Sequence, residues 1–88
     1  MARFEGAAGE AAALGAASGG ADVFFKLGMM YSTGSSVPAD YVSAHKWFNL
    51  AAMGGCSEAI RLRREVADLM SEAEISAAQR AARDWIGR

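Results

Sequence analysis

The chain has 88 residues, enough for one small domain, and its 52% apolar and 22% charged residues are typical of globular proteins. Nine Lys and Arg against ten Asp and Glu give a formal net charge of −1, and neither half of the chain is strongly basic, which argues against a nucleic-acid partner. One cysteine excludes an internal disulfide and a multi-cysteine zinc site, and one histidine excludes metal motifs that need two histidines.

The composition favours helices, because alanine is the commonest residue and β-branched residues are few. The first predicted helix covers residues 4–17 and is weakened by three glycines. A turn at residues 18–20 separates it from a helix over residues 21–31. That helix is apolar nearly all round, so we expect it to be covered on several sides. Its main apolar face follows helical spacing: Phe24, Leu27, Gly28 and Tyr31.

A loop over residues 32–39 comes next, because Gly34 and Pro38 break helices. Asp40 is a suitable N-cap for a helix over residues 41–53, which Gly54 and Gly55 end. One face of this helix is predicted to be buried, with further apolar residues beside it. The face consists of Tyr41, Ala44, Phe48 and Ala51, and its neighbours are Val42, Trp47 and Leu50.

Two more helices are predicted in the last third of the chain. One covers residues 57–70, with a charged outer face and an inner face formed by Ala59, Leu62, Val66 and Leu69. The segment from Ser71 to Glu74 is a capping box that starts the last helix, which runs to about Ile86. Its inward residues are Ile75, Ala78, Ala82 and Trp85.

The sequence also repeats itself. A shift of 35 residues places 16–27 on 51–62, with five of the twelve positions identical. A period in this range is typical of stacked repeat architectures. Only about two copies fit in 88 residues, fewer than the roughly three that a self-sufficient stack usually needs.

The middle of the chain resembles a Sel-1-like repeat, a branch of the tetratricopeptide-type α/α solenoids. The positions that carry the resemblance are Leu27, Gly28, Tyr31, Gly34, Val37, Asp40, Ala44, Trp47, Phe48, Ala51, Ala52 and Gly54. The pattern departs from the family at the second loop glycine, where serine stands at Ser35 or Ser36. It departs again in the following copy, where Arg63 follows Leu62 in place of glycine.

The resemblance implies an all-α fold, a short α/α solenoid of antiparallel helix hairpins. Residues 1–88 then form one helical-repeat domain. Its parts are a weak N-terminal helix at 4–17, a full repeat at 21–54 and C-terminal capping helices at 57–88. Small residues at Gly28 and Ala44 would let the two helices of the repeat approach closely.

Candidates for chemistry are weak. His45 and Cys56 could form a base and a nucleophile, but no third group completes such a site, so we expect a surface histidine and a small buried cysteine. A cluster of arginines, Arg61, Arg63 and Arg64, is interleaved with acidic residues and is interpreted as a solvated helix face. No catalytic, cofactor-binding or metal-binding residue is predicted, and no cofactor.

The predicted function is therefore contact with other proteins rather than catalysis. The first hypothesis is a small accessory or assembly subunit docked on a larger multi-subunit complex; the alternative is a free-standing adaptor that binds peptide segments transiently. Self-association through open repeat ends is a further option. The expected compartment is the cytoplasm or the cytoplasmic face of a membrane complex, because the chain has no apolar run long enough to span a bilayer. Candidate contact residues are Phe4, Leu14, Phe24, Phe25 and Met29.

Overall fold

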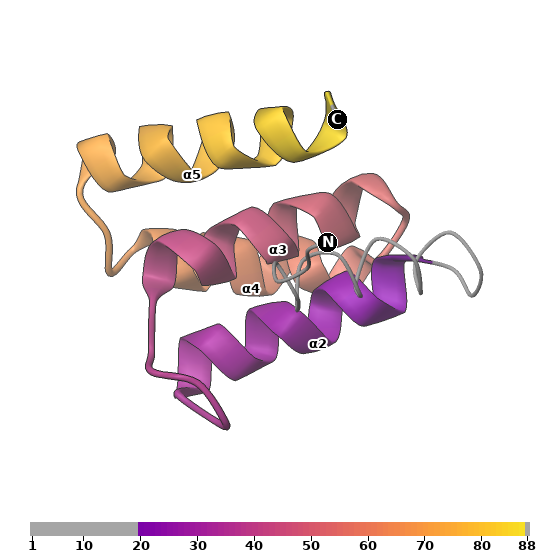
Figure 1. Cartoon of the computed structure of the whole chain (residues 1–88), viewed down its shortest axis with the longest axis horizontal. Helices are drawn as coiled ribbons and strands as arrows, with labels where there is room; N and C mark the ends of the chain where they lie inside the picture. Colours follow the sequence, from indigo (N-terminus) through magenta and orange to yellow (C-terminus); the bar gives the residue numbers. More distant parts are fainter. Residues whose placement is uncertain (1–19, 88) are drawn as a thin grey trace, which may run out of the picture.

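The computed structural model describes residues 20–87, which form four helices and no strand (Figure 1). The predicted helix over 4–17 lies outside the described residues. The helices are α2 (Gly20–Thr33), α3 (Tyr41–Met53), α4 (Ser57–Ala67) and α5 (Glu72–Ile86). Successive helices run in opposite directions (Figure 1). The prediction of a short all-α solenoid is confirmed.

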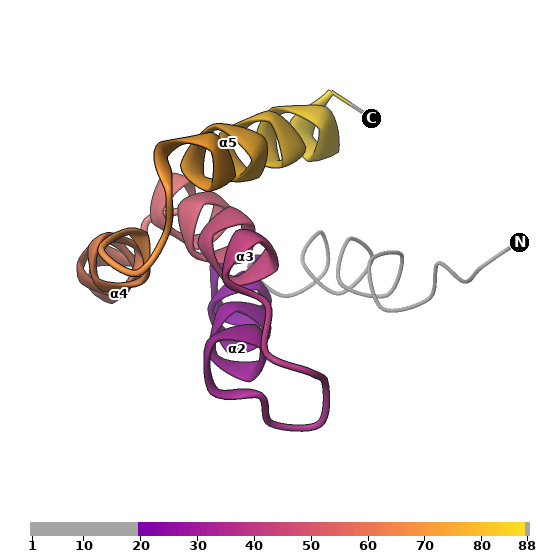
Figure 2. The same ribbon diagram turned by 90° about the vertical axis from the view of Figure 1, so that its left-hand side faces the viewer.

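Helix α3 is the centre of the described structure. The other three helices pack on different sides of it and contact one another little (Figure 2). This explains why burial on α3 extends well beyond the single predicted face. The sequence predicts that Tyr41, the first residue of α3, lies on the buried face. That prediction is wrong, since 39% of the residue is exposed. The buried residues of α3 are Ala44, His45, Trp47, Phe48, Leu50 and Ala51.

The core has two parts, divided by α3. One part joins α3 to α4 and contains Ala44, Phe48, Ala51, Ala59 and Val66. The other joins α3 to α5 and contains Trp47, Leu50 and Ala82. Apolar residues of α2 pack against both parts, so α2 covers the boundary between them. The prediction that this helix must be covered on more than one side agrees with this arrangement.

Local signals fix both ends of α3. Asp40 has an extended backbone, and its side chain accepts a hydrogen bond from the Ser43 backbone N–H. At the other end, Gly54 donates to carbonyls of the last turn, and Gly55 has a φ of 103°, a conformation that favours glycine. The predicted bounds of this helix are therefore confirmed. The capping box at Ser71 is also present, and α5 ends at Ile86 as expected.

Helix α4 ends at Ala67, earlier than the predicted Met70. The N–H groups of Leu69 and Met70 bond to carbonyls three residues back, which tightens the chain into a turn. That turn rotates Leu69 away from the core, so its predicted inward position is wrong: 64% of the residue is exposed. Two other residues of the predicted inner face of α4, Ala59 and Val66, are buried as predicted.

Candidate functional site

The residues that define the repeat lie in the hairpin of α2 and α3. Five of them are buried: Gly28, Ala44, Trp47, Phe48 and Ala51. Four are half-buried: Leu27, Tyr31, Val37 and Ala52. The other three serve the loops. Gly34 has a φ of 76°, Asp40 caps α3, and Gly54 ends α3 close to Ala21 at the start of α2.

An aromatic cluster holds α2, α3 and α5 together. The ring of Phe24 stacks on Trp47 at a centroid distance of 5.6 Å, and Trp85 meets Trp47 edge-on at 5.1 Å. The Lys46 ammonium lies 4.0 Å from the centroid of the Trp47 ring, within the range of a cation–π interaction. The sequence made Phe24 a candidate for partner contact, but its ring packs against other rings of the same chain.

The two other described contact candidates lie one helical turn apart on α2. Phe25 is half-buried against Phe48, at a ring-centroid distance of 5.8 Å. Met29 is 37% exposed. Residues four apart are neighbours on one helix face, so Phe25 and Met29 form a continuous apolar strip that begins in the core and ends in solvent. Phe4 and Leu14 lie outside the described residues.

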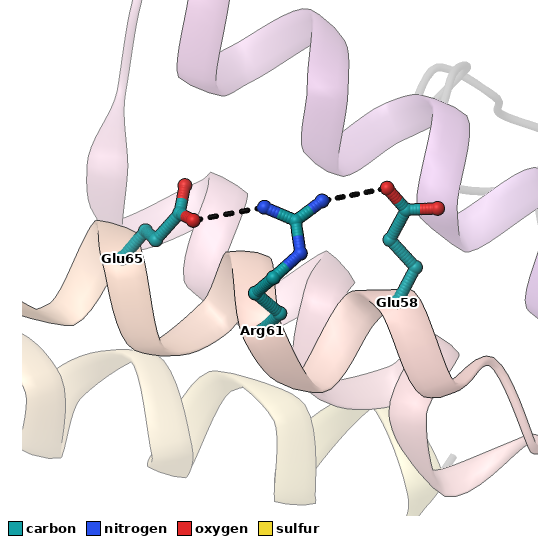
Figure 3. Close-up of polar contacts among 3 residues, drawn as sticks. All are labelled: Glu58, Arg61 and Glu65. Carbon is teal, nitrogen blue, oxygen red and sulfur yellow. Dashed lines mark hydrogen bonds and ion pairs between the residues drawn. The ribbon is translucent and has the colours of Figure 1, made fainter.

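A row of charged side chains follows one side of α4 (Figure 3). The Arg61 guanidinium donates to Glu58 at 2.7 Å and to Glu65 at 2.9 Å. All three side chains are 58% exposed, so the row is solvated and adds little stability. The predicted solvated face holds for Arg61 but not for Arg63, whose guanidinium donates to the side-chain oxygen of Asn49 on α3.

The prediction of a surface histidine is wrong. His45 is 4% exposed, and its Nδ1 atom has no hydrogen-bond partner among residues 20–87. Burial lowers the pKa of His45, and the charge of Arg63 lowers it further. Cys56 is half-buried at the N-cap of α4 and packs against the apolar cluster there. In the described part of the chain, no hydrogen bond joins these two side chains.

Sequence reasoning missed the contact of α4 with α3 through Arg63. The signal for it was present in the 35-residue period, which places Arg63 at the position of Gly28. Gly28 lets α2 approach α3 closely. At the matching position of α4, the long side chain of Arg63 instead bonds to Asn49 on the facing helix α3.

An open hollow of about 470 Å³ lies where the loop before α3 meets the start of α5. Both of its carboxylates already serve as helix caps, Asp40 for α3 and Glu74 in the capping box of α5. Its other lining residues are Tyr31, Pro38, Ala39, Tyr41 and Val42. Within residues 20–87, no group of three metal-ligating side chains could hold an ion, and no helix is long and apolar enough to cross a bilayer.

The family model described as Sel1 repeat matches residues 25–56 of the chain. No curated protein and no solved structure matches the chain. The matched span runs from the apolar strip of α2, through the loop and α3, to the N-cap of α4. Sel1 repeats are non-catalytic modules that mediate contacts between proteins. Residues 25–56 of this chain are therefore a Sel1 repeat.

Proposed function

We propose that this chain is a small accessory or assembly subunit that docks on a larger protein complex, in the cytoplasm or on the cytoplasmic face of a membrane. The observation that carries the proposal is the apolar strip of Phe25 and Met29 on α2. Its inner residue is fixed against Phe48, and its outer residue is 37% exposed. An anchored apolar side chain at a surface is suited to insertion between proteins.

The size of the core supports docking over independent existence. Among the described residues, Phe48 is the only large side chain that is fully buried. A core of this size leaves a small margin of stability, since even larger domains are stable by only about 5–15 kcal/mol. Binding to a partner would add stability by mass action. The alternative, a free-standing adaptor that binds peptide segments transiently, would not be stabilised by a partner for most of the time.

The proposal is tested by size fractionation of a gently solubilised native lysate, with the chain followed by mass spectrometry. Three forms are compared: the wild type, Met29→Lys and Met53→Lys. Met53 is the matched control, because it is also a methionine near the C-terminal end of its helix and is 62% exposed. We expect the wild type and the control to migrate with one large assembly, and Met29→Lys to be released from it.

Two outcomes would contradict the proposal. Migration of the wild type alone, near 9.2 kDa, would overturn the accessory subunit and favour the transient adaptor. Release of Met53→Lys, with Met29→Lys still bound, would show that the contact surface is not on α2. Circular dichroism of both variants checks that they are folded.

A further inference from the structure

His45 is a buried, titratable side chain that the interaction function does not explain. The residue is 4% exposed, and its buried Nδ1 atom has no hydrogen-bond partner in the part of the chain that the structure describes. A neutral ring tolerates this position because one nitrogen carries no proton. A protonated ring does not, because it would present a charged N–H donor to an environment that offers no acceptor.

The facing helix α4 contributes a positive charge near His45. Arg63 on α4 donates to the side chain of Asn49, which lies on the same face of α3 as His45, one turn later. Arg63 is the charged side chain that acts on His45, and no carboxylate from the described parts of α2, α4 or α5 offsets it. The Arg61 guanidinium is occupied by Glu58 and Glu65, and the Lys46 ammonium lies over the ring of Trp47.

Helix α4 is attached to the rest of the structure mainly through α3. It packs on α3 through Ala59 and Val66 and has few contacts with α2 or α5. In the 35-residue repeat, Arg63 of α4 corresponds to Gly28 of α2, the residue that lies against Phe48. Phe48 contributes to both the α3–α4 contact and the α2–α3 hairpin, but the hairpin has a second set of core contacts without α4, in which Phe24 stacks on Trp47.

We propose that His45 is an acid-sensitive latch that holds α4 against α3 when neutral and releases it when protonated. Protonation places two positive charges, on His45 and Arg63, at one helix contact and leaves a buried donor without an acceptor. The hairpin of α2 and α3 stays folded, because it keeps contacts in which α4 takes no part: Gly28 lies against Phe48, and Phe24 stacks on Trp47. The inference is independent of which partner the Sel1 repeat binds.

The direction of the pH dependence follows from linkage. His45 has a lower pKa in the folded chain than its usual value of 6.5, so the unfolded or detached state binds the proton more readily. Attachment of α4 is complete above that usual value. It weakens as the pH falls through it and stops changing once the pH is below the folded pKa.

The test is carried out on the full chain by NMR, with two readouts. The first is the titration of the His45 ring, expected at a pKa below 6.5. The second is hydrogen-exchange protection, corrected for intrinsic rates, at about pH 7.5 and about pH 5.5, on either side of the ordinary histidine pKa. We expect protection of α4 to fall relative to α2 by a factor of at most about ten, because pH 5.5 lies about one unit below the ordinary histidine pKa and each unit corresponds to tenfold.

Matched variants separate a latch from general acid sensitivity. Arg63→Gln keeps a donor for Asn49 but removes the charge, so it should raise the pKa of His45 and reduce the loss of α4 protection. Arg64→Gln, at the exposed neighbouring position, should behave as the wild type. His45→Gln should abolish the selective loss; if that variant does not fold, the titration of the wild type decides. A His45 pKa at or above 6.5, or equal loss of protection in α2 and α4, would overturn the proposal.

Discussion

Gly28 on α2 lies directly against the ring of Phe48 on α3. A Cβ built on Gly28 would lie 2.5 Å from two atoms of that ring, closer than real Cβ contacts allow. Phe48 is itself fully buried, so its ring is enclosed by other residues. The absence of a side chain at Gly28 is therefore a packing requirement of the hairpin.

We expect Gly28→Ala to lower the free energy of unfolding by about 1–3 kcal/mol, the usual cost of overpacking. A loss of stability would be specific to the contact with Phe48, because alanine inside a helix is otherwise about 0.5–1 kcal/mol more stable than glycine. Urea unfolding followed by circular dichroism measures the change. Gly87→Ala is the control: Gly87 has a φ of −74° and an added Cβ would approach only backbone oxygens, so little change is expected. Equal or greater stability of Gly28→Ala would refute the close approach.

Ser36 is a second position where glycine and a residue with a side chain should differ in stability. Its φ is 71°, in the left-handed region, and with Ser35 it is one of the two serines that stand in place of the second loop glycine of the Sel-1-like pattern. A left-handed residue other than glycine costs about 1–2 kcal/mol, part of which glycine returns through the greater entropy of the unfolded chain. We expect Ser36→Gly to stabilise the chain by about 0.5–1 kcal/mol.

Thermal unfolding measures the effect, and the neighbouring Ser35→Gly is the control. Ser35 does not have a positive φ, and its hydroxyl shares a hydrogen bond with Thr33 at 2.8 Å. Glycine there gains nothing and loses that bond, so the control should be neutral or destabilised. If both variants behaved alike, strain at Ser36 would not be the cause.

The sequence predicted helix ends well where the signal is local. Asp40 and the pair Gly54-Gly55 bound α3, and Ser71 with Glu74 starts α5, because these groups satisfy backbone atoms of their own helix. The end of α4 carries no such signal. Apolar spacing continues past Ala67 to Leu69, and only the turn toward α5 ends the helix.

Burial of His45 could not be predicted for a different reason. Periodicity within one helix indicates a single apolar stripe, whereas α3 is covered by three helices. Which polar residues become buried depends on where α4 and α5 settle, and that follows from long-range packing. The contact strip on α2 was only partly separable from the core by sequence, since Phe24 and Phe25 are adjacent and both half-buried.

Trp47 tests whether the aromatic cluster is structural. The residue is 4% exposed and its ring contacts Phe24, Trp85 and the Lys46 ammonium. We expect Trp47→Ala to lose about 3–5 kcal/mol, most or all of the stability of so small a domain. Tyr41→Ala, at a 39% exposed position on the same helix, should lose about 1 kcal/mol or less. A stable Trp47→Ala variant that fails to bind its complex would instead make Trp47 an interface anchor.

Asp40 links the loop of the repeat to the start of α3. Its carboxylate accepts from the Ser43 backbone N–H at 3.2 Å and from the Ser43 hydroxyl at 2.8 Å, while its own N–H donates to the Tyr31 carbonyl at 2.9 Å. Asp40→Ala removes the two side-chain bonds and should lower the free energy of unfolding by about 1 kcal/mol. Asp40→Asn keeps an acceptor oxygen at the cap and should lie close to the wild type. Chemical unfolding of the three forms checks this order. If alanine and asparagine were equally destabilising, the charge at the helix N-terminus, rather than the capping hydrogen bond, would be the source of the stabilisation.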